Sequence, residues 1–250
     1  MSSQQQAFRW LADAATVVVL SGAGISTDSG IPDFRGPQGV WTRDPGAERM
    51  ATIRHYLADP DLRKRSWQTR LSSPIWEAEP NAGHLALARL EPRVTVITQN
   101  IDGLHQKAGS QWVVELHGSA WDSRCTNCGD VRPMRETLAR VTAGEDDPPC
   151  LICSGILKSA TISFGENLDH DVIGAAVAAT ETAEVFLAVG STLGVHPAAG
   201  LVPHARRTAA RVIIANAEPT PYDDLADLVF RESLSEILPS ITDPECRPGG

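Results

Sequence analysis

The chain has 250 residues, of which 42% are hydrophobic and 21% charged, and its formal net charge is −9. This composition is typical of a folded globular protein and excludes a disordered chain. The acidic balance argues against autonomous nucleic-acid binding, which needs a basic surface, and suits a cationic partner such as a lysine-bearing protein segment. No apolar stretch reaches the ~18 residues that cross a bilayer, and the first residues lack the features of a secretory signal. We therefore expect no membrane association and a cytoplasmic location.

The order of the predicted elements indicates an α/β fold with a doubly wound, Rossmann-like parallel sheet. A helical insertion and a cysteine-rich module interrupt the alternation of strands and helices. We expect a Rossmann-like domain of residues 1–36, 94–121 and 158–250, a helical insertion at 37–93 and a cysteine-rich module at 122–157. The predicted strands are 16–20, 94–98, 113–116, 184–189 and 211–215, and the predicted helices are 4–15, 53–57, 62–71, 81–90, 171–180 and 233–238.

The segment that follows the first predicted strand is typical of a phosphate-binding loop. Gly22 and Gly24 let backbone N–H groups approach a pyrophosphate, and we expect Ser26 and Thr27 to cap the helix that follows. The loop departs from the G-x-G-x-x-G dinucleotide fingerprint, because Thr27 stands where the third glycine is expected.

An acid, an aromatic ring and a cation come next, at Asp33, Phe34 and Arg35. An ordinary hydride-transfer site has no need of this trio. No acidic residue follows a second strand about twenty residues beyond Gly24, as a dehydrogenase would require. Both observations argue against a nicotinamide-dependent dehydrogenase.

Polar side chains also follow the later predicted strands. Asn100 and Asp102 offer an amide and a carboxylate that could hold water and a carboxamide, although both residue types also shape ordinary turns. His117 has a side chain whose pKa near neutrality suits a general base, whereas we expect His105 to pack or cap. Because ligands bind beyond the carboxyl ends of the strands in such a sheet, these groups should meet at one edge.

Two further loops follow strands at the same edge. Residues 190–197 supply small hydroxyl side chains suited to phosphate or ribose oxygens, and residues 216–218 could hold the hydroxyls of an adenosine ribose. Each of these segments alone is also compatible with an ordinary loop.

Four of the five cysteines form two Cys-x-x-Cys pairs, Cys125 with Cys128 and Cys150 with Cys153. This spacing matches a four-thiolate zinc site, in which two hairpins close a tetrahedron. With all four positions filled by sulfur, no place is left for a reactive water, so the zinc should be structural. Cys246 lies in a tail rich in proline and glycine and has no partner in this pattern.

Taken together, the motifs resemble those of the sirtuin family of NAD-dependent protein lysine deacylases. The resemblance covers about residues 16–240. The matching pieces are 22–26, 34–36, 98–102, 116–118, the four cysteines, 164–166, 190–193 and Asn216.

The resemblance implies a reaction in which the acyl oxygen of a modified lysine attacks the nicotinamide ribose of NAD and nicotinamide leaves. His117 then acts as general base on a ribose hydroxyl, while Asn100 positions ribose or water and Phe34 covers the reacting carbon. Water completes the release of free lysine and O-acyl-ADP-ribose. The implied NAD contacts are Gly22, Ala23, Gly24, Ser26, Thr27, Asp33, Phe34, Arg35, Trp41, Gln99, Asn100, Ile101, Asp102, His117, Gly190, Ser191, Thr192, Asn216, Ala217 and Glu218.

The resemblance also implies that an acyl-lysine protein segment binds as an extra strand between residues 163–166 and 194–196. The implied substrate contacts are Ile162, Phe164, Gly165 and Val195. Deacetylation is the default. Trp67 and Arg70 align with a Tyr-x-x-Arg pair that binds an acyl carboxylate in desuccinylating members, but both residues are equally compatible with packing on an amphipathic helix.

Two departures from the family pattern concern the same sites. The usual Gly-Thr-Ser order appears as Gly190, Ser191 and Thr192, which keeps a hydroxyl at both places, and Ser163 replaces a bulky apolar residue. Mono-ADP-ribosyl transfer from the same NAD site is an alternative activity, and a non-catalytic NAD sensor is a third. The sequence does not define the oligomeric state and is compatible with a monomer.

Overall fold

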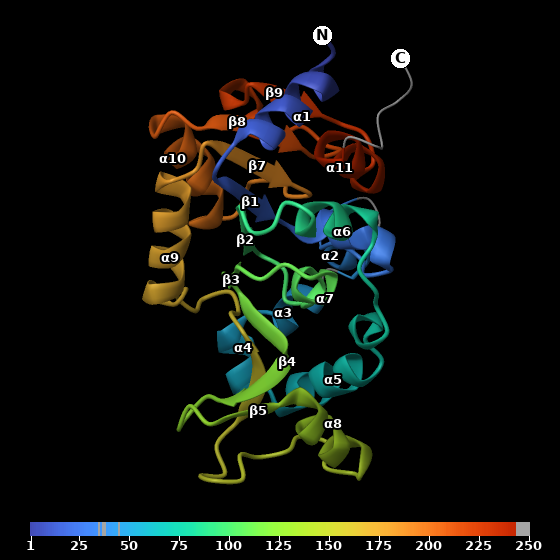
Figure 1. Cartoon of the computed structure of the whole chain (residues 1–250). Helices are drawn as coiled ribbons and strands as arrows, with labels where there is room; N and C mark the ends of the chain where they lie inside the picture. The colour runs from blue at the N-terminus through green and yellow to red at the C-terminus, as the bar shows by residue number, and fades with distance from the viewer. Residues whose placement is uncertain (35, 37–38, 45, 244–250) are drawn as a thin grey trace.

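The computed structural model describes residues 1–34, 36, 39–44 and 46–243, and it consists of two lobes stacked along the long axis (Figure 1). The upper lobe holds a six-stranded sheet and both chain ends, and the lower lobe holds a three-stranded sheet. The predicted role of Arg35 lies outside the described residues.

The large sheet is parallel throughout and has the strand order β3-β2-β1-β7-β8-β9. Counted within the sheet this order is 3-2-1-4-5-6, which is that of Rossmann folds, so the predicted fold class is confirmed. The strands are β1 (Val17–Ser21), β2 (Val94–Thr98), β3 (Val113–Glu115), β7 (Val185–Val189), β8 (Arg211–Ala215) and β9 (Leu228–Phe230).

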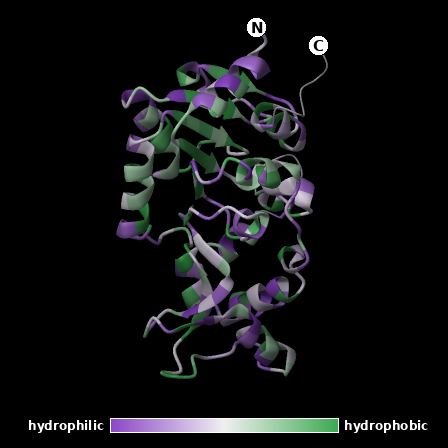
Figure 2. Cartoon of the chain, viewed as in Figure 1, coloured by the Kyte–Doolittle hydropathy of each residue, from purple (hydrophilic) through white to green (hydrophobic). Residues whose placement is uncertain are grey.

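Helices cover both faces of the large sheet, and therefore every residue of β1 is buried (Figure 2). Val17 and Val19 join the apolar cluster beneath one group of helices, and Val18 and Leu20 join the cluster on the opposite face. The first face carries α1 (Ser3–Asp13), α6 (Ala82–Ala88) and α11 (Leu234–Thr242), and the second carries α9 (His170–Glu181) and α10 (Leu201–Arg207).

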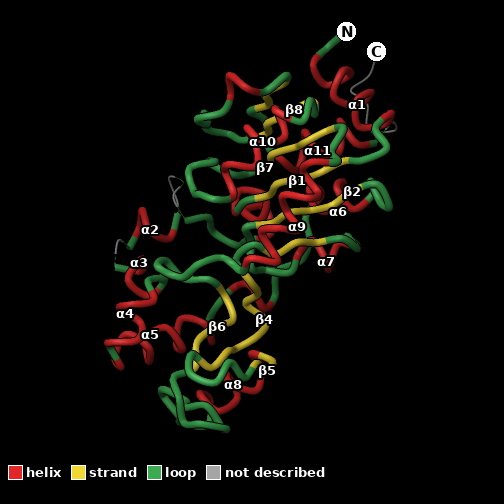
Figure 3. The backbone as a smooth tube through the Cα atoms, turned by 90° about the vertical axis from the view of Figure 1, so that its left-hand side faces the viewer, coloured by secondary structure: helices red, strands yellow, loops and turns green. Residues whose placement is uncertain are grey.

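The small sheet is antiparallel and has the order β5-β4-β6. Its strands are β4 (Gly118–Cys125), β5 (Val131–Pro133) and β6 (Leu157–Thr161), and α8 (Met134–Thr142) packs beside it (Figure 3). The expected module boundaries at 121/122 and 157/158 fall inside β4 and β6. β4 therefore leads from the residue after His117 to Cys125, and β6 returns from the cysteine-rich module to the site.

The insertion forms a series of short helices, and the longest of them packs in the lower lobe. Asp59 caps the longest of them by accepting hydrogen bonds from the N–H groups of Asp61 and Leu62, with Pro60 at its first position. The helices are α2 (Val40–Arg43), α3 (Ala47–Met50), α4 (Ile53–Ala58) and α5 (Pro60–Leu71). Among the described residues, no helix combines the length and the apolar character that a bilayer crossing demands.

The expected caps of the phosphate loop are wrong. The helix η1 (Ala23–Ser29) is a 3₁₀ helix that starts before Ser26 and Thr27, and Gly22 precedes it without any side-chain cap. The sequence analysis also did not predict α2, α3, α8, α10, β9 or the strands of the small sheet. β9 has only three residues, too few for its periodicity to be recognised.

Candidate functional site

The carboxyl ends of β1, β2, β7 and β8 meet at one edge of the large sheet and line a cavity of about 1580 Å³ that continues between the lobes. This volume exceeds that of a typical small-molecule pocket and leaves room for a dinucleotide together with an extended side chain. The predicted residues that line it are Gly22, Ala23, Gly24, Thr27, Asp33, Phe34, Trp41, Arg70, Gln99, Asn100, Ile101, His117, Ile162, Phe164, Gly165, Gly190, Ser191, Thr192, Val195, Asn216, Ala217 and Glu218.

Glycines let the loops after β1 and β7 touch backbone to backbone. Gly24 N–H donates to the Gly190 carbonyl at 2.8 Å, and a Cβ on Gly24 would lie 2.8 Å from Gly190 Cα. Gly190 has a φ of 60°, and a Cβ there would lie 2.5 Å from the nitrogen of Ile25. No side chain fits between these loops, so the cavity floor here is bare backbone. That is the surface a pyrophosphate needs.

His117 stands at the start of β4, between the two lobes. Its Nδ1 lies 2.9 Å from the carbonyl oxygen of Gln99. Because a carbonyl only accepts, Nδ1 carries the proton of the neutral ring and Nε2 keeps a lone pair. Burial lowers the pKa of His117 below 6.5, while the bond to Gln99 acts in the opposite direction. The imidazole is therefore neutral at pH 7 and able to accept a proton.

A buried hydrogen-bond network fixes Asn100 beside this histidine. The Asn100 side-chain nitrogen donates to the Gly22 carbonyl at 3.1 Å and to Ser26 Oγ at 3.2 Å. Ser26 Oγ in turn donates to Asp102 Oδ2 at 2.7 Å, and Asp102 Oδ1 accepts from Leu104 N–H. Both amide hydrogens of Asn100 are thus committed to protein acceptors.

Ser26 and Asp102, two of the predicted NAD contacts, are not among the residues that line the cavity. They are 1% and 4% exposed, and they lie behind Asn100. The structure therefore places them where they hold Asn100 rather than on the cavity wall.

Three aromatic rings link the loop before α2 to the loop after β6. The ring centroids of Phe34 and Trp41 lie 4.9 Å apart, and those of Trp41 and Phe164 lie 5.3 Å apart. Phe34 and Phe164 remain 42% and 37% exposed. These rings form an apolar wall where the predicted nucleotide and peptide contacts meet.

The loop after β6 is held on one side only. The N–H of Phe164 donates to Ala51 and its carbonyl accepts from Ile53 N–H, at 2.8 and 3.0 Å. Glu166 Oε2 accepts from Ser163 N–H and from the buried Lys158 ammonium, at 2.7 and 2.6 Å. The opposite side of this short extended segment faces the cavity, as strand addition requires.

Trp67 and Arg70 are separated by the structure. Trp67 is fully buried in the core of the lower lobe with Met134 and Leu157, so it cannot contact an acyl group in the cavity. Arg70 lines the cavity, and no described residue accepts a hydrogen bond from its buried Nε. Burial lowers the pKa of Arg70, and the neighbouring Tyr56 opposes that shift.

The loop after β8 is shaped by an arginine that the sequence analysis missed. Arg231 donates to the carbonyls of Asn216 and Glu218 at 2.8 and 3.2 Å and pairs with Asp223. The Asn216 side chain also donates to the Glu218 carbonyl at 2.8 Å. These bonds set the backbone of the segment predicted to hold the adenosine ribose.

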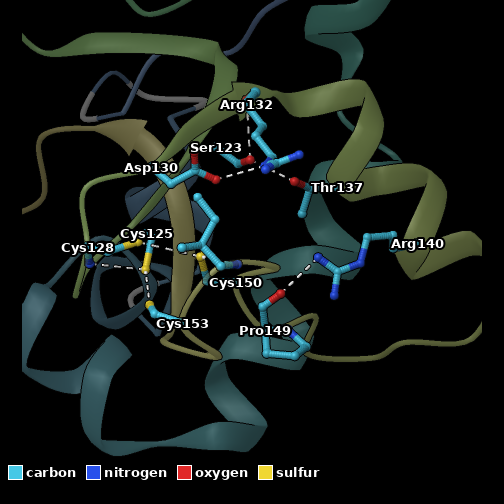
Figure 4. A network of polar contacts seen from close by, with 11 residues as sticks. Ser123, Cys125, Cys128, Asp130, Arg132, Thr137, Arg140, Pro149, Cys150 and Cys153 are labelled. Carbon is cyan, nitrogen blue, oxygen red and sulfur yellow. Dashed lines mark hydrogen bonds and ion pairs between the residues drawn. The ribbon is translucent and has the colours of Figure 1, made fainter.

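The four predicted zinc ligands converge, and Figure 4 shows their sulfur atoms turned toward one another. Their Sγ atoms all lie within 4.8 Å of one another, and the Cys125–Cys153 and Cys128–Cys150 pairs are 3.5 and 3.7 Å apart. A tetrahedron with Zn–S bonds of about 2.3 Å has sulfur separations of about 3.8 Å, so the four thiolates fit zinc.

The turns that carry the cysteines are shaped for thiolates. The N–H groups of Asn127 and Ile152 point at the sulfurs of Cys125 and Cys150, at 3.4 Å each. Such bonds stabilise a charged sulfur. In Figure 4 an ion pair of Asp130 with Arg132 lies beside the cysteines.

The model of the Sir2 family matches residues 22–197. NAD-dependent protein deacetylase 2 of Streptomyces coelicolor is 56% identical over 90% of this chain and 95% of its own length. NAD-dependent protein deacylase 2 of Pyrobaculum aerophilum is 40% identical over 93% of this chain and 92% of its own length. A solved structure described as "Sir2-p53 peptide-NAD+" superposes with a TM-score of 0.84 at 34% identity, covering 95% of this chain and 96% of that one.

A Rossmann-type sheet with a dinucleotide-sized cavity, joined to a closed four-thiolate site, defines a nucleotide-dependent enzyme with a structural zinc module. The chain belongs to the Sir2 family, the sirtuins.

Proposed function

We propose that this protein removes acetyl groups from lysine side chains of other proteins by transferring them to the ADP-ribose part of NAD. The class of activity, NAD-dependent protein deacylation, is that of the Sir2 family to which the chain belongs. The observation that carries the assignment to this site is the neutral His117, with its Nε2 lone pair on the same cavity wall as Asn100 and the glycine loop.

Bound NAD supplies an electrophilic ribose carbon, which takes the acyl oxygen as nicotinamide leaves. The N–H groups of Gly22 and Gly24 are bonded to the carbonyls of Val189 and Gly190, so the backbone of Ala23 between them binds the phosphates. Asn216 with Glu218 holds the distal ribose. Asn100 orients the ribose near the reacting carbon, and Phe34 shields that carbon from water.

His117 performs the proton transfer. Its Nε2 accepts the proton of a ribose hydroxyl, which then attacks the acyl carbon, while the Gln99 carbonyl stabilises the resulting imidazolium through Nδ1–H. Water then adds to the acyl carbon, and the bond from that carbon to the lysine nitrogen breaks to release the free amine. Ordered general-base catalysis of this kind contributes on the order of 10²–10⁴-fold in rate.

The direct test uses an acetyl-lysine peptide, NAD and mass detection of the nucleotide product. The proposal predicts nicotinamide, free lysine and O-acetyl-ADP-ribose in equal amounts. ADP-ribosylated protein in place of O-acetyl-ADP-ribose would instead support the transferase alternative.

A second candidate substrate class, lysines with anionic acyl groups, is favoured by one observation. Arg70 is a cavity-lining cation whose buried Nε has no acceptor among the described residues. Trp67 does not line the cavity, so Arg70 alone of this pair would contact the acyl group. A carboxylate at the end of the acyl chain would satisfy the guanidinium.

Matched acetyl and succinyl peptides test this second class. If Arg70 binds an acyl carboxylate, Arg70→Met lowers kcat/KM for the succinyl peptide by 10-fold or more and changes that for the acetyl peptide little. Equal losses on both peptides would assign Arg70 to structure alone.

We further propose that the protein acts in the cytoplasm as a monomer. A reducing compartment keeps the paired cysteines available as metal ligands, which supports this location. Cell fractionation and light scattering of the purified protein test the two statements; a secreted or dimeric protein would contradict them.

A further inference from the structure

Two buried histidines that the reaction does not use lie behind the site. His84 on α6 and His105 on α7 (Leu104–Ala108) are 0% and 1% exposed. Their ring centroids are 4.9 Å apart and the planes meet at 64°, edge to face. Each ring has one buried nitrogen without a hydrogen-bond partner among the described residues: His84 Nε2 and His105 Nδ1.

The partners of the other two nitrogens fix where the protons are. His84 Nδ1 accepts from the backbone N–H of Asn81, so the proton of a neutral His84 sits on Nε2. Ser21 Oγ gives its only proton to Thr98 Oγ1, at 2.8 Å. The 2.8 Å contact of Ser21 Oγ with His105 Nε2 must therefore use a proton on the ring, which leaves His105 Nδ1 as an acceptor.

The two unpartnered nitrogens are thus complementary: His84 Nε2–H is a donor and His105 Nδ1 is an acceptor, and the two rings are neighbours. Leaving both unsatisfied would cost the desolvation penalty of each buried nitrogen. Burial lowers the pKa of His84 to about 4 and that of His105 to about 3, so both rings are neutral at pH 7.

We propose that one water bridges the two rings, accepting from His84 Nε2–H and donating to His105 Nδ1, and that this pair completes a relay that positions Asn100. From His105 the relay passes through Ser21 to Thr98, whose Oγ1 accepts from the backbone N–H of Asn100 at 3.0 Å.

The other end of the relay reaches the nucleotide loop. The Asn81 side chain accepts from the N–H groups of Gly83 and His84 as the cap of α6. Its amide nitrogen donates to the Ile25 carbonyl at 2.7 Å and to Ser29 Oγ at 2.9 Å, both in η1. Asn81, His84 and His105 therefore couple the helix that carries Gly24 to the strand end that carries Asn100, and they act as positioning residues.

The experiment compares variants that remove one side of the water-bridged His84–His105 contact. His84→Asn keeps an acceptor for Asn81 and deletes the donor at Nε2. His105→Gln keeps a donor for Ser21 and deletes the acceptor at Nδ1. Each is expected to lower kcat by on the order of 10- to 100-fold, with the KM for NAD changed much less, because misplacement of a catalytic group has that effect. The double variant should lose no more than the worse single one, since both remove the same bridged contact.

A kcat within twofold of wild type in both single variants, or losses that multiply in the double variant, would overturn the relay. His105→Asn, which keeps an acceptor near Nδ1 but loses Ser21, tests the Ser21 end and should lose activity as well. Thermal melting of each variant checks folding, and reduced stability with unchanged kcat would leave the histidines a structural role only and contradict the proposal.

The kinetic readout rests on the proposed deacylase activity, and a second readout does not. Long-range ¹⁵N–¹H NMR correlations assign the proton position in each ring of the folded wild type. The relay predicts the Nε2–H form for both His84 and His105. An Nδ1–H form in either ring would refute it even if deacylation is confirmed.

Discussion

The two lobes are stabilised by different means. The large sheet buries apolar side chains on both faces, in two clusters built from strands and helices. The lower lobe has one small cluster of six buried residues, and two of those six are the zinc ligands Cys125 and Cys150. The comparison teaches that the upper lobe can fold on packing alone, whereas in the lower lobe the metal site is part of the core.

The largest effect should come from removing a zinc ligand. Cys150→Ser opens the thiolate site, and zinc binding supplies folding free energy on the order of 10 kcal/mol in small zinc modules. The lower lobe should lose its cooperative melting transition, together with bound zinc measured by elemental analysis, while the transition of the large sheet persists. Cys246→Ser, at the remaining cysteine, is the control.

If the melting of the lower lobe were unchanged after a chelator had removed all the zinc, the contrast between the two lobes would be wrong. It would mean that the apolar contacts of Trp67, Met134 and Leu157 hold the lower lobe without metal.

A smaller effect is expected where the loops of the upper lobe touch. Gly190→Ala forces a side chain into a φ of 60° and against the nitrogen of Ile25, so it should lower the free energy of unfolding by about 1–3 kcal/mol and weaken NAD binding. Denaturant titration and calorimetry measure the two losses. Gly174→Ala, on α9 with nothing near its Cβ, should be neutral or slightly stabilising.

If Gly190→Ala bound NAD as the wild type does, the backbone floor between β1 and β7 would not be the phosphate site.

The smallest effect concerns pH. Burial lowers the pKa of His117, so the base stays deprotonated to a lower pH than a free imidazole. The kcat/KM for the acetyl peptide should fall at low pH with a midpoint below 6.5, because protonation removes the Nε2 lone pair. The exposed His170, changed to Asn, should leave the profile as it is. A midpoint above 6.5 would contradict the assigned environment of His117.

Local patterns predicted much of this molecule. The four cysteines, the strand ends and the glycine loop are short motifs, so their spacing alone placed them correctly. Ser26 and Asp102 were predicted at the cavity wall and lie behind it, because which face a loop side chain takes depends on partners distant in sequence.

Contacts between residues far apart in the sequence were not predicted either, because local patterns do not show which distant residues meet. Asn81 bonds to Ile25 and Arg231 to the carbonyl of Asn216, and no local pattern marks either pair. The position of Trp67 also depends on distant contacts. The family alignment placed it in the cavity, whereas the structure buries it in the core of the lower lobe.

The central claim is that a neutral His117 acts as the base that completes acyl transfer after nicotinamide has left. It is tested by incubating His117→Ala with NAD, acetyl-lysine peptide and labelled nicotinamide. The account predicts that label still exchanges into NAD while free lysine and O-acetyl-ADP-ribose fall by on the order of 10²–10⁴-fold. Product formation at the wild-type rate by this variant would contradict it.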